Sequence, residues 1–243
     1  MQATEQCVIV DNVTKEYAKK AVLKEVSIQV QKAEIYGFLG PSGAGKTTLV
    51  KIIAGIEEAT NGTVNVFGEA MPKLHLMQRM GYMTQSDALY EEMSALENLD
   101  FFASIYGLKG AKKKQRINEV MELVGLSEDI RKIVANYSGG MKRRLSLATA
   151  LLHEPELVLL DEPTVGIDPV LRNTIWIELE RLSKQGKTII VTTHVMDEAE
   201  RCHRLAMLRD GKLIASGSPA DLKEAANVTS LEQVFLKYGG GLQ

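Results

Sequence analysis

The feature that most constrains this chain is a glycine-rich loop that stands between a strand pattern and a helix pattern. The loop reads Gly-Pro-Ser-Gly-Ala-Gly-Lys-Thr over residues 40–47. The continuous apolar segment Ile35–Leu39 before it predicts a strand that is buried on both faces. Residues from about 45 to 54 after it predict a helix that ends near Gly55. This order of strand, loop and helix indicates an α/β fold.

The chemistry of the loop suits a polyanion. Its glycines leave room for backbone N–H groups to turn inward, and the N-terminal end of the following helix is partially positive. Lys46 adds a full positive charge, and the hydroxyl of Thr47 can ligate Mg²⁺. The loop matches the P-loop pattern, which predicts a nucleoside triphosphate as ligand. The residues predicted to hold this nucleotide are Gly40, Pro41, Ser42, Gly43, Ala44, Gly45, Lys46, Thr47 and Thr48.

A second motif places two carboxylates at the end of another predicted strand. The apolar residues Leu157–Leu160 are followed directly by Asp161 and Glu162. Ligands of open α/β sheets bind at the carboxyl ends of the strands. Asp161 there suits the ligand shell of Mg²⁺, and Glu162 can orient or deprotonate an attacking water. A strand that ends in two acids is common, so this motif has weight only beside the loop.

A third motif is a second anion-binding surface that has no lysine of its own. Ser138, Gly139 and Gly140 stand where a helix pattern begins, ahead of the acidic strand. A serine and two glycines at a helix N-terminus offer several N–H donors to an anion. One chain does not need two phosphate cradles for one nucleotide, whereas two chains placed head to tail do. The sequence therefore predicts a dimer that encloses the nucleotide.

With these three motifs in order, the chain resembles the ABC ATPase family over roughly residues 8–217. The signature of that family is usually Leu-Ser-Gly-Gly-Gln, and this chain has Tyr137 and Met141 at the two flanking positions. The Ser-Gly-Gly core is intact. The resemblance implies that each site joins the loop and acids of one chain to the Ser-Gly-Gly core of a second nucleotide-binding subunit. Intact Glu162 and Ser138 favour a homodimer.

The resemblance also carries roles to four further places in the chain. It implies that Tyr17 stacks on adenine, that Gln85 reaches Mg²⁺ and water, and that His194 hydrogen-bonds the γ-phosphate. It implies that residues 163–168 form the loop that crosses the dimer axis. The implied cofactors are ATP and Mg²⁺. The implied catalytic residues are Glu162, His194, Gln85 and Lys46, and the implied metal ligands are Thr47, Gln85 and Asp161.

The expected fold is a P-loop core with a mostly parallel sheet, an N-terminal antiparallel β subdomain and a helical insert. The core and β region are expected over about 1–85 and 155–220, the insert over about 86–154, and a short helical tail over about 221–243. An Asn61-Gly62 turn is expected before a strand at Val64 and Val66. Helices are expected over Ala95–Tyr106, Lys114–Val124, Ser138–Leu152, Val170–Lys184 and Met196–Arg201, and a closing hairpin is expected through Asp210-Gly211.

Composition limits the partners. The 29 basic and 31 acidic residues nearly cancel, so we expect no binding to nucleic acid. Apolar runs of about four residues are far shorter than the roughly 20 that a membrane span needs, and the first 11 residues do not read as a signal peptide. Cys7 and Cys202 stand in no metal-binding spacing and fit a reducing compartment. We expect a cytoplasmic protein that meets the inner face of the cell membrane only through an integral membrane permease.

The tail separates the possible machines. Residues 230–236 and the segment 96–107 resemble the ATPases of ABC-2-type exporters, which favours export of a substrate through a separate permease. An importer ATPase of similar length stays an alternative. A soluble ABC ATPase that acts on ribosomes or DNA is disfavoured, because only about 90 residues without heptads separate Thr47 from Ser138. A P-loop kinase or GTPase would have no use for the Ser-Gly-Gly core. The transported substrate is not encoded in this chain.

Overall fold

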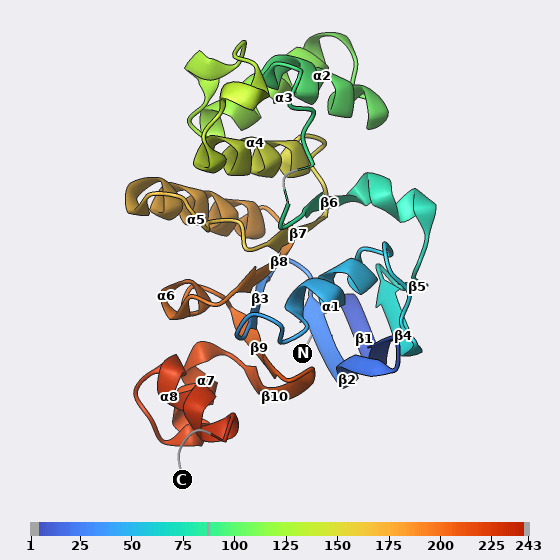
Figure 1. Ribbon diagram of the computed structural model, residues 1–243, viewed down its shortest axis with the longest axis vertical. Coiled ribbons are helices and arrows are strands. Elements are labelled where there is room, and N and C mark those ends of the chain that lie inside the picture. Colours follow the sequence, from blue (N-terminus) through green and yellow to red (C-terminus); the bar gives the residue numbers. More distant parts are fainter. Residues whose placement is uncertain (1–4, 87, 241–243) are drawn as a thin grey trace. The chain divides into compact units, whose positions relative to one another are not determined.

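The computed structural model describes residues 5–86 and 88–240, and these residues form two compact units. The first unit combines the part of the chain up to Leu74 with the part from Ser183 onward, and the second unit is His75–Leu182. In Figure 1 the first unit brings a blue and an orange segment side by side, because a strand from the C-terminal part of the chain pairs with a strand from the N-terminal part.

The N-terminal half of the first unit is an antiparallel sheet in the order β2-β1-β4-β5. Alternate residues such as Val8 and Val10 are buried, as a sheet with one covered face requires. The expected Asn61-Gly62 turn is wrong. Asn61 instead pairs with Thr14 as the first residue of its strand, next to a register shift. The strands are β1 (Gln6–Tyr17), β2 (Lys20–Gln31), β4 (Asn61–Val66) and β5 (Glu69–Ala70).

The rest of the first unit is a mostly parallel sheet with helices. β3 (Ile35–Leu39) pairs in parallel with β8 (Thr188–Thr193) and with β9 (Arg204–Arg209). Every residue of β3 and β8 is buried, in agreement with the apolar run seen in the sequence. β9 and β10 (Lys212–Gly217) form the predicted antiparallel hairpin. The helices are α1 (Lys46–Ile53), α6 (Met196–Ala199), α7 (Pro219–Ala226) and α8 (Leu231–Tyr238).

The second unit contains a parallel strand pair and helices. β6 (Met80–Met83) pairs with β7 (Leu157–Asp161). The short 3₁₀ segments are η1 (Leu74–Arg79), η2 (Ser127–Asp129) and η3 (Val134–Asn136), and η1 begins at the boundary between the two units. Asp168 caps the long helix with its carboxylate, which accepts from the backbone N–H groups of Val170 and Leu171. The helices are α2 (Ala95–Ile105), α3 (Gly110–Leu123), α4 (Gly139–Leu151) and α5 (Pro169–Lys184), whose last residues belong to the first unit.

The expected fold class is confirmed: an antiparallel N-terminal sheet, a mostly parallel core and a helical segment are all present. α3 begins at Gly110, four residues ahead of the expected start, because the lysine-rich run forms its exposed first turns. Among the residues that the structure describes, no helix has both the length and the hydropathy that a membrane crossing demands.

Candidate functional site

The predicted phosphate loop links β3 to α1 in the first unit. Lys46 is the first residue of α1, and its side chain is only 5% exposed. Its ammonium group donates to the backbone oxygens of Gly40, at 2.6 Å, and Pro41, at 3.1 Å. The lysine side chain thus folds back over the first residues of the loop. When a phosphate binds, this ammonium group can donate its hydrogen bonds to the phosphate oxygens instead of to the loop.

Two glycines of this loop are required by their surroundings. A Cβ on Gly40 would lie 2.2 Å from the backbone oxygen of Leu208, which cannot move without breaking the sheet. Gly45 has φ +101°, and a Cβ there would lie 2.6 Å from a methyl group of Leu23. The loop can therefore pass this close to its neighbouring strands only with glycine at both positions. Its backbone N–H groups remain at the N-terminal end of α1, where an anion is favoured.

His194 lies at the same sheet edge as the loop. β3 and β8 run in parallel with Leu39 opposite Thr193, so Gly40 and His194 each follow a residue of one matched pair. His194 is exposed. The turn behind it is held by Thr193, whose hydroxyl donates to the carboxylate of Glu198 at 2.6 Å. The histidine that the resemblance assigns to the γ-phosphate thus follows the strand that pairs with the one before the loop.

Tyr17 is tied to the helix that follows the phosphate loop. The tyrosine ring is 43% exposed, at the end of β1, and its hydroxyl donates to the carboxylate of Glu57. Partial burial and the hydrogen bond and negative charge of Glu57 raise the pKa of Tyr17, although a hydrogen bond from Thr48 opposes this. The phenol therefore stays protonated and its ring is held at a fixed place beside α1. An exposed, anchored ring is suited to stack on a flat base.

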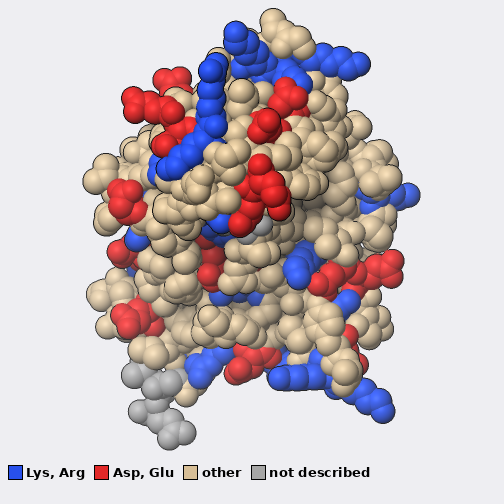
Figure 2. Space-filling model, turned by 45° about the horizontal axis from the view of Figure 1, so that its top comes forward, with Lys and Arg blue, Asp and Glu red and all other residues tan. Residues whose placement is uncertain are grey.

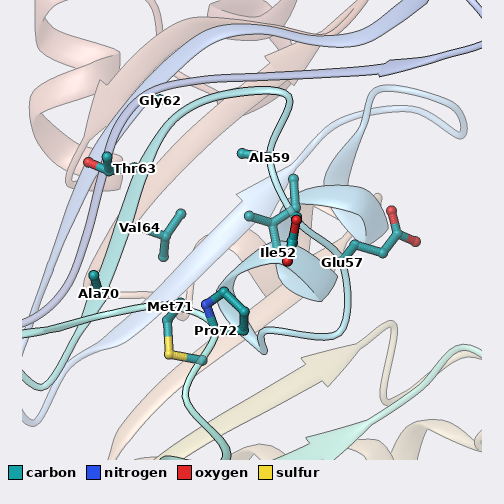
Figure 3. Close-up of a pocket in the computed structure, with 10 residues that line it drawn as sticks. Ile52, Glu57, Ala59, Gly62, Thr63, Val64, Ala70, Met71 and Pro72 are labelled. Atoms are coloured by element: carbon teal, nitrogen blue, oxygen red, sulfur yellow. The ribbon is translucent and has the colours of Figure 1, made fainter.

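Glu57, whose carboxylate anchors Tyr17, also lines a pocket of the first unit. Figure 3 shows Ile52, Val64 and Met71 among its lining residues, and Glu57 at its margin. These residues come from the C-terminal end of α1, from β4 and from the segment after β5. The phosphate loop precedes the N-terminal end of α1 instead. We therefore assign the nucleotide to the loop end of the helix and not to this pocket.

The second unit carries the predicted acids and the glutamine at one edge of its strand pair. β6 and β7 are parallel with Met83 opposite Leu160, so Gln85 and the two acids follow shortly after paired residues. Asp161 is fully buried. Glu162 is half-buried and adopts φ +52°, a left-handed conformation that is unusual for a residue with a side chain. Sharp turns of this kind are common where a strand presents a functional group.

Ser138 begins α4, as the sequence predicted. Its hydroxyl accepts from the backbone N–H of Met141 at 3.2 Å, and Ser138 and Gly139 are exposed. The unusual Tyr137 is accommodated beneath this surface, because it is only 5% exposed and its hydroxyl donates to the backbone oxygen of Asp129. Burial, and next the charge of Asp129, raises the pKa of Tyr137 to about 12. The departure from leucine therefore leaves the exposed Ser-Gly-Gly core unchanged.

Sequence reasoning missed Arg143. This residue lies on α4 and is 7% exposed, and its guanidinium donates to the backbone oxygens at the ends of both β6 and β7. Its neighbour Arg144 is equally basic in the sequence, so the residue type alone gives no signal. The helical period places the two arginines on different sides of α4, but only the structure shows what each side faces.

Oxygen donors dominate the predicted metal ligands. Thr47 offers a hydroxyl, Gln85 an amide oxygen and Asp161 a carboxylate. Mg²⁺ prefers such ligands and usually takes only one or two carboxylates, together with water and phosphate oxygens. Each of these donors therefore suits Mg²⁺ by its chemistry; Thr47 belongs to the first unit, and Gln85 and Asp161 belong to the second.

Comparison with known proteins assigns the chain to a family. The family described as ABC transporter matches residues 23–165, more than half of the chain. The linearmycin resistance ATP-binding protein LnrL of Bacillus subtilis (strain 168) is 41% identical over 215 residues, which cover 87% of this chain and 69% of that protein. Nod factor export ATP-binding protein I of Burkholderia pseudomallei (strain 1710b) is 43% identical over 216 residues, which cover 88% of this chain and 71% of that protein.

Longer relatives and solved structures agree. The probable multidrug ABC transporter ATP-binding protein YbhF of Escherichia coli (strain K12) is 39% identical over 92% of this chain, which spans 40% of that protein. A structure described as the ATP-binding subunit of an ABC transporter aligns with TM-score 0.89 at 27% identity, over 96% of this chain and 99% of that one. The dimeric, post-hydrolysis cassette MJ0796, bound to ADP and Pi, aligns with TM-score 0.80 at 27% identity, over 87% of this chain and 98% of that one. On these similarities and on its own motifs, the chain belongs to the ABC transporter family.

Proposed function

We propose that this chain hydrolyses ATP and thereby powers the export of a substrate through a separate membrane permease. The observation that carries the proposal is the presence of two phosphate-binding surfaces on one chain. The first is the lysine-bearing loop before α1, and the second is the lysine-free Ser-Gly-Gly start of α4. The similarity to a dimeric cassette bound to ADP and Pi supports the same use of the two surfaces.

Within each site we assign the residues separate tasks. Lys46 and the loop N–H groups bind the β- and γ-phosphates, and Tyr17 stacks on the adenine. Glu162 holds the attacking water and accepts its proton, while Gln85 and His194 orient the water and the γ-phosphate. When bound, Mg²⁺ at Thr47, Gln85 and Asp161 supplies charge neutralisation to the phosphate oxygens. Ser138, Gly139 and Gly140 of a second copy complete the cradle from the other side.

Hydrolysis in this arrangement is coupled to closing and opening of a dimer. Two copies of the chain grip the γ-phosphate from both sides, so ATP favours the closed dimer over the open one. Cleavage of the γ-phosphate removes a ligand that both copies hold, and the dimer loosens. A homodimer has two equivalent sites, because a two-fold axis relates the loop of each copy to the Ser-Gly-Gly core of the other.

The contact with the permease is proposed for an aromatic cluster in the second unit. Tyr90, Phe101 and Phe102 pack against one another with ring centroids 5.0–6.1 Å apart. Tyr90 is 45% exposed and Phe101 39% exposed, so the cluster presents contiguous ring surface to solvent. Buried Asn98 fixes the segment that carries Tyr90 through hydrogen bonds to its backbone N–H and backbone oxygen. A rigid, exposed cluster on this segment is suited to receive a helix of a permease.

The proposal places the chain on the inner face of the cell membrane, held there by the permease. Export over import is supported by the relative named for Nod factor export, beside relatives named for linearmycin resistance and for a multidrug ABC transporter. Figure 2 shows basic and acidic side chains interspersed on the visible face, which is not what a nucleic-acid-binding surface requires. Expression of the chain together with the membrane proteins encoded beside its gene should bring it to the membrane fraction. A chain that never sediments with membranes under these conditions would contradict the transport role.

A smaller effect is expected at the proposed adenine contact. Replacing Tyr17 with Ala removes the stacked ring and should weaken ATP binding about tenfold. Tyr17→Phe keeps the ring and loses only the hydrogen bond to Glu57, so it should retain most of the affinity. Isothermal titration calorimetry with ATP separates the two outcomes. If Tyr17→Ala binds ATP with wild-type affinity, the adenine does not stack on Tyr17.

A further inference from the structure

Arg143 makes an unusual set of contacts for a buried cation. Its Nη1 donates to the backbone oxygens of Thr84, at 2.7 Å, and Gln85, at 3.0 Å. Its Nη2 donates to the backbone oxygens of Asp161 and, at 2.7 Å, Glu162, and Nε also donates to Glu162 at 3.2 Å. One side chain thus donates five hydrogen bonds to four backbone carbonyl groups. These four groups belong to two pairs of consecutive residues.

These carbonyl groups belong to the two segments that carry the proposed catalytic side chains of the second unit. Thr84 and Gln85 follow β6, and Asp161 and Glu162 end and follow β7. A buried guanidinium that bridges the two segments fixes their backbones relative to each other, because each donor direction is set by the planar group. The bond to Glu162 has a further consequence, since this residue is held at φ +52°, where a non-glycine backbone needs support.

Lysine cannot reproduce this bridge. A guanidinium presents five N–H donors in a rigid fork, whereas an ammonium group has three donors around a single atom. One ammonium group cannot reach carbonyl oxygens on both segments with the same geometry. Arg143→Lys therefore keeps a positive charge and a long side chain but loses most of the bridge.

The position of Arg143 on α4 links this bridge to the Ser-Gly-Gly surface. Ser138 caps the helix five residues earlier, about 7.5 Å along the axis. Ser138 and Arg143 therefore lie on one continuous helix, so a displacement of its N-terminal end would be felt at the guanidinium group. Buried Leu145 and Leu147 hold the following part of the helix in the core of the second unit.

We propose that Arg143 is a positioning residue, which sets the backbones of Gln85 and Glu162 and connects them to the helix that meets the partner's ATP. The inference rests on the proposed function, since it assigns Glu162 and Gln85 to the hydrolysis of ATP. When Ser138 binds the nucleotide of the other copy, the positions of Gln85 and Glu162 in its own chain are then affected through Arg143.

The test compares two neighbouring arginines. Arg144 lies on the same helix and donates to the backbone oxygens of Val124 and Gly125, at the end of α3. Arg143→Lys should lower the kcat of ATP hydrolysis about tenfold or more with little change in KM, because misplaced catalytic groups affect the chemical step and not the binding of ATP. Arg144→Lys should leave kcat near the wild-type value. The thermal unfolding temperature of each variant shows how much of any loss in kcat comes from a loss of stability.

A second variant and a double mutant complete the design. Arg143→Met fills a similar volume without donors and should lower kcat at least as much as Arg143→Lys. In the background of Glu162→Gln, the additional effect of Arg143→Lys on kcat should be clearly smaller than in the wild type, because one of the two groups that it positions is already disabled.

Each outcome decides between the alternatives. Wild-type kcat in Arg143→Lys would overturn the positioning role, and so would equal losses in Arg143→Lys and Arg144→Lys that follow their loss of stability. If both Arg143 variants fail to fold where Arg144→Lys folds, Arg143 is a structural residue and the inference is wrong. Failure of the proposed function is a different result, namely a wild-type protein that does not hydrolyse ATP.

Discussion

Replacing Glu162 with Gln should lower kcat for ATP hydrolysis by about two to four orders of magnitude, while ATP still binds. The amide has the shape of the carboxylate but cannot accept the proton of the attacking water. The phosphate loop lies in the other unit and is unchanged, so Lys46 still holds the nucleotide. The backbone oxygen of Glu162 still receives the guanidinium of Arg143, which preserves the local fold.

The same variant should accumulate as a dimer. ATP that is bound but not cleaved continues to hold both copies, so the closed state is not released. Size-exclusion chromatography of Glu162→Gln with ATP should give a dimer, and without ATP a smaller species. Glu156 is a matched control, because it stands at the opposite end of β7 and forms an exposed ion pair with Arg79. Glu156→Gln should hydrolyse ATP normally and should not be trapped. Normal turnover in Glu162→Gln would exclude this residue as the base.

Replacing Lys46 with Ala should act on binding instead of on the chemical step. The ammonium group is buried and donates to two loop oxygens, so its removal takes a full charge from the surface that faces the phosphates. Removing one charged partner from a buried contact of this kind makes the binding free energy of ATP less favourable by about 3 kcal/mol, which is about two orders of magnitude in affinity. Hydrolysis is lost with the affinity.

Calorimetry measures this loss directly. ATP titrated into Lys46→Ala should show a dissociation constant about a hundredfold higher than for the wild type. Lys223→Ala provides the control, since that lysine forms an ion pair with Glu200 away from the loop. An unchanged dissociation constant in Lys46→Ala would show that the loop does not hold the phosphates.

Local patterns in the sequence predicted the elements that present the site. About 20 consecutive residues contain all the signals for the first of these, namely the apolar run of β3, the glycines of the loop and the helix after them. The same holds for β7 with its two acids and for the serine cap of α4. These elements depend on local hydrogen bonding and burial, which a period-2 or period-3.6 pattern reports.

Other features depend on contacts between distant residues and were not predictable. β1 extends to Tyr17 although its last part is exposed, because it pairs with β2 on one side and β4 on the other. Asn61-Gly62 has turn-forming residues, yet pairing with β1 places it in a strand. Arg143 and its four acceptors lie 18–59 residues apart in the chain. The proposed roles of the site residues likewise remain predictions until the variants are measured.

The most direct test of the shared site mixes two inactive variants. Lys46→Ala lacks a working loop and Ser138→Arg lacks a working cap, and each should be inactive alone. In a head-to-tail dimer of one copy of each, one site contains the intact loop and the intact cap. An equilibrated equal mixture should therefore recover about a quarter of the wild-type ATPase rate, since half of the dimers are mixed and each has one intact site. A mixture that stays as inactive as its two components would contradict a site built from two copies of the chain.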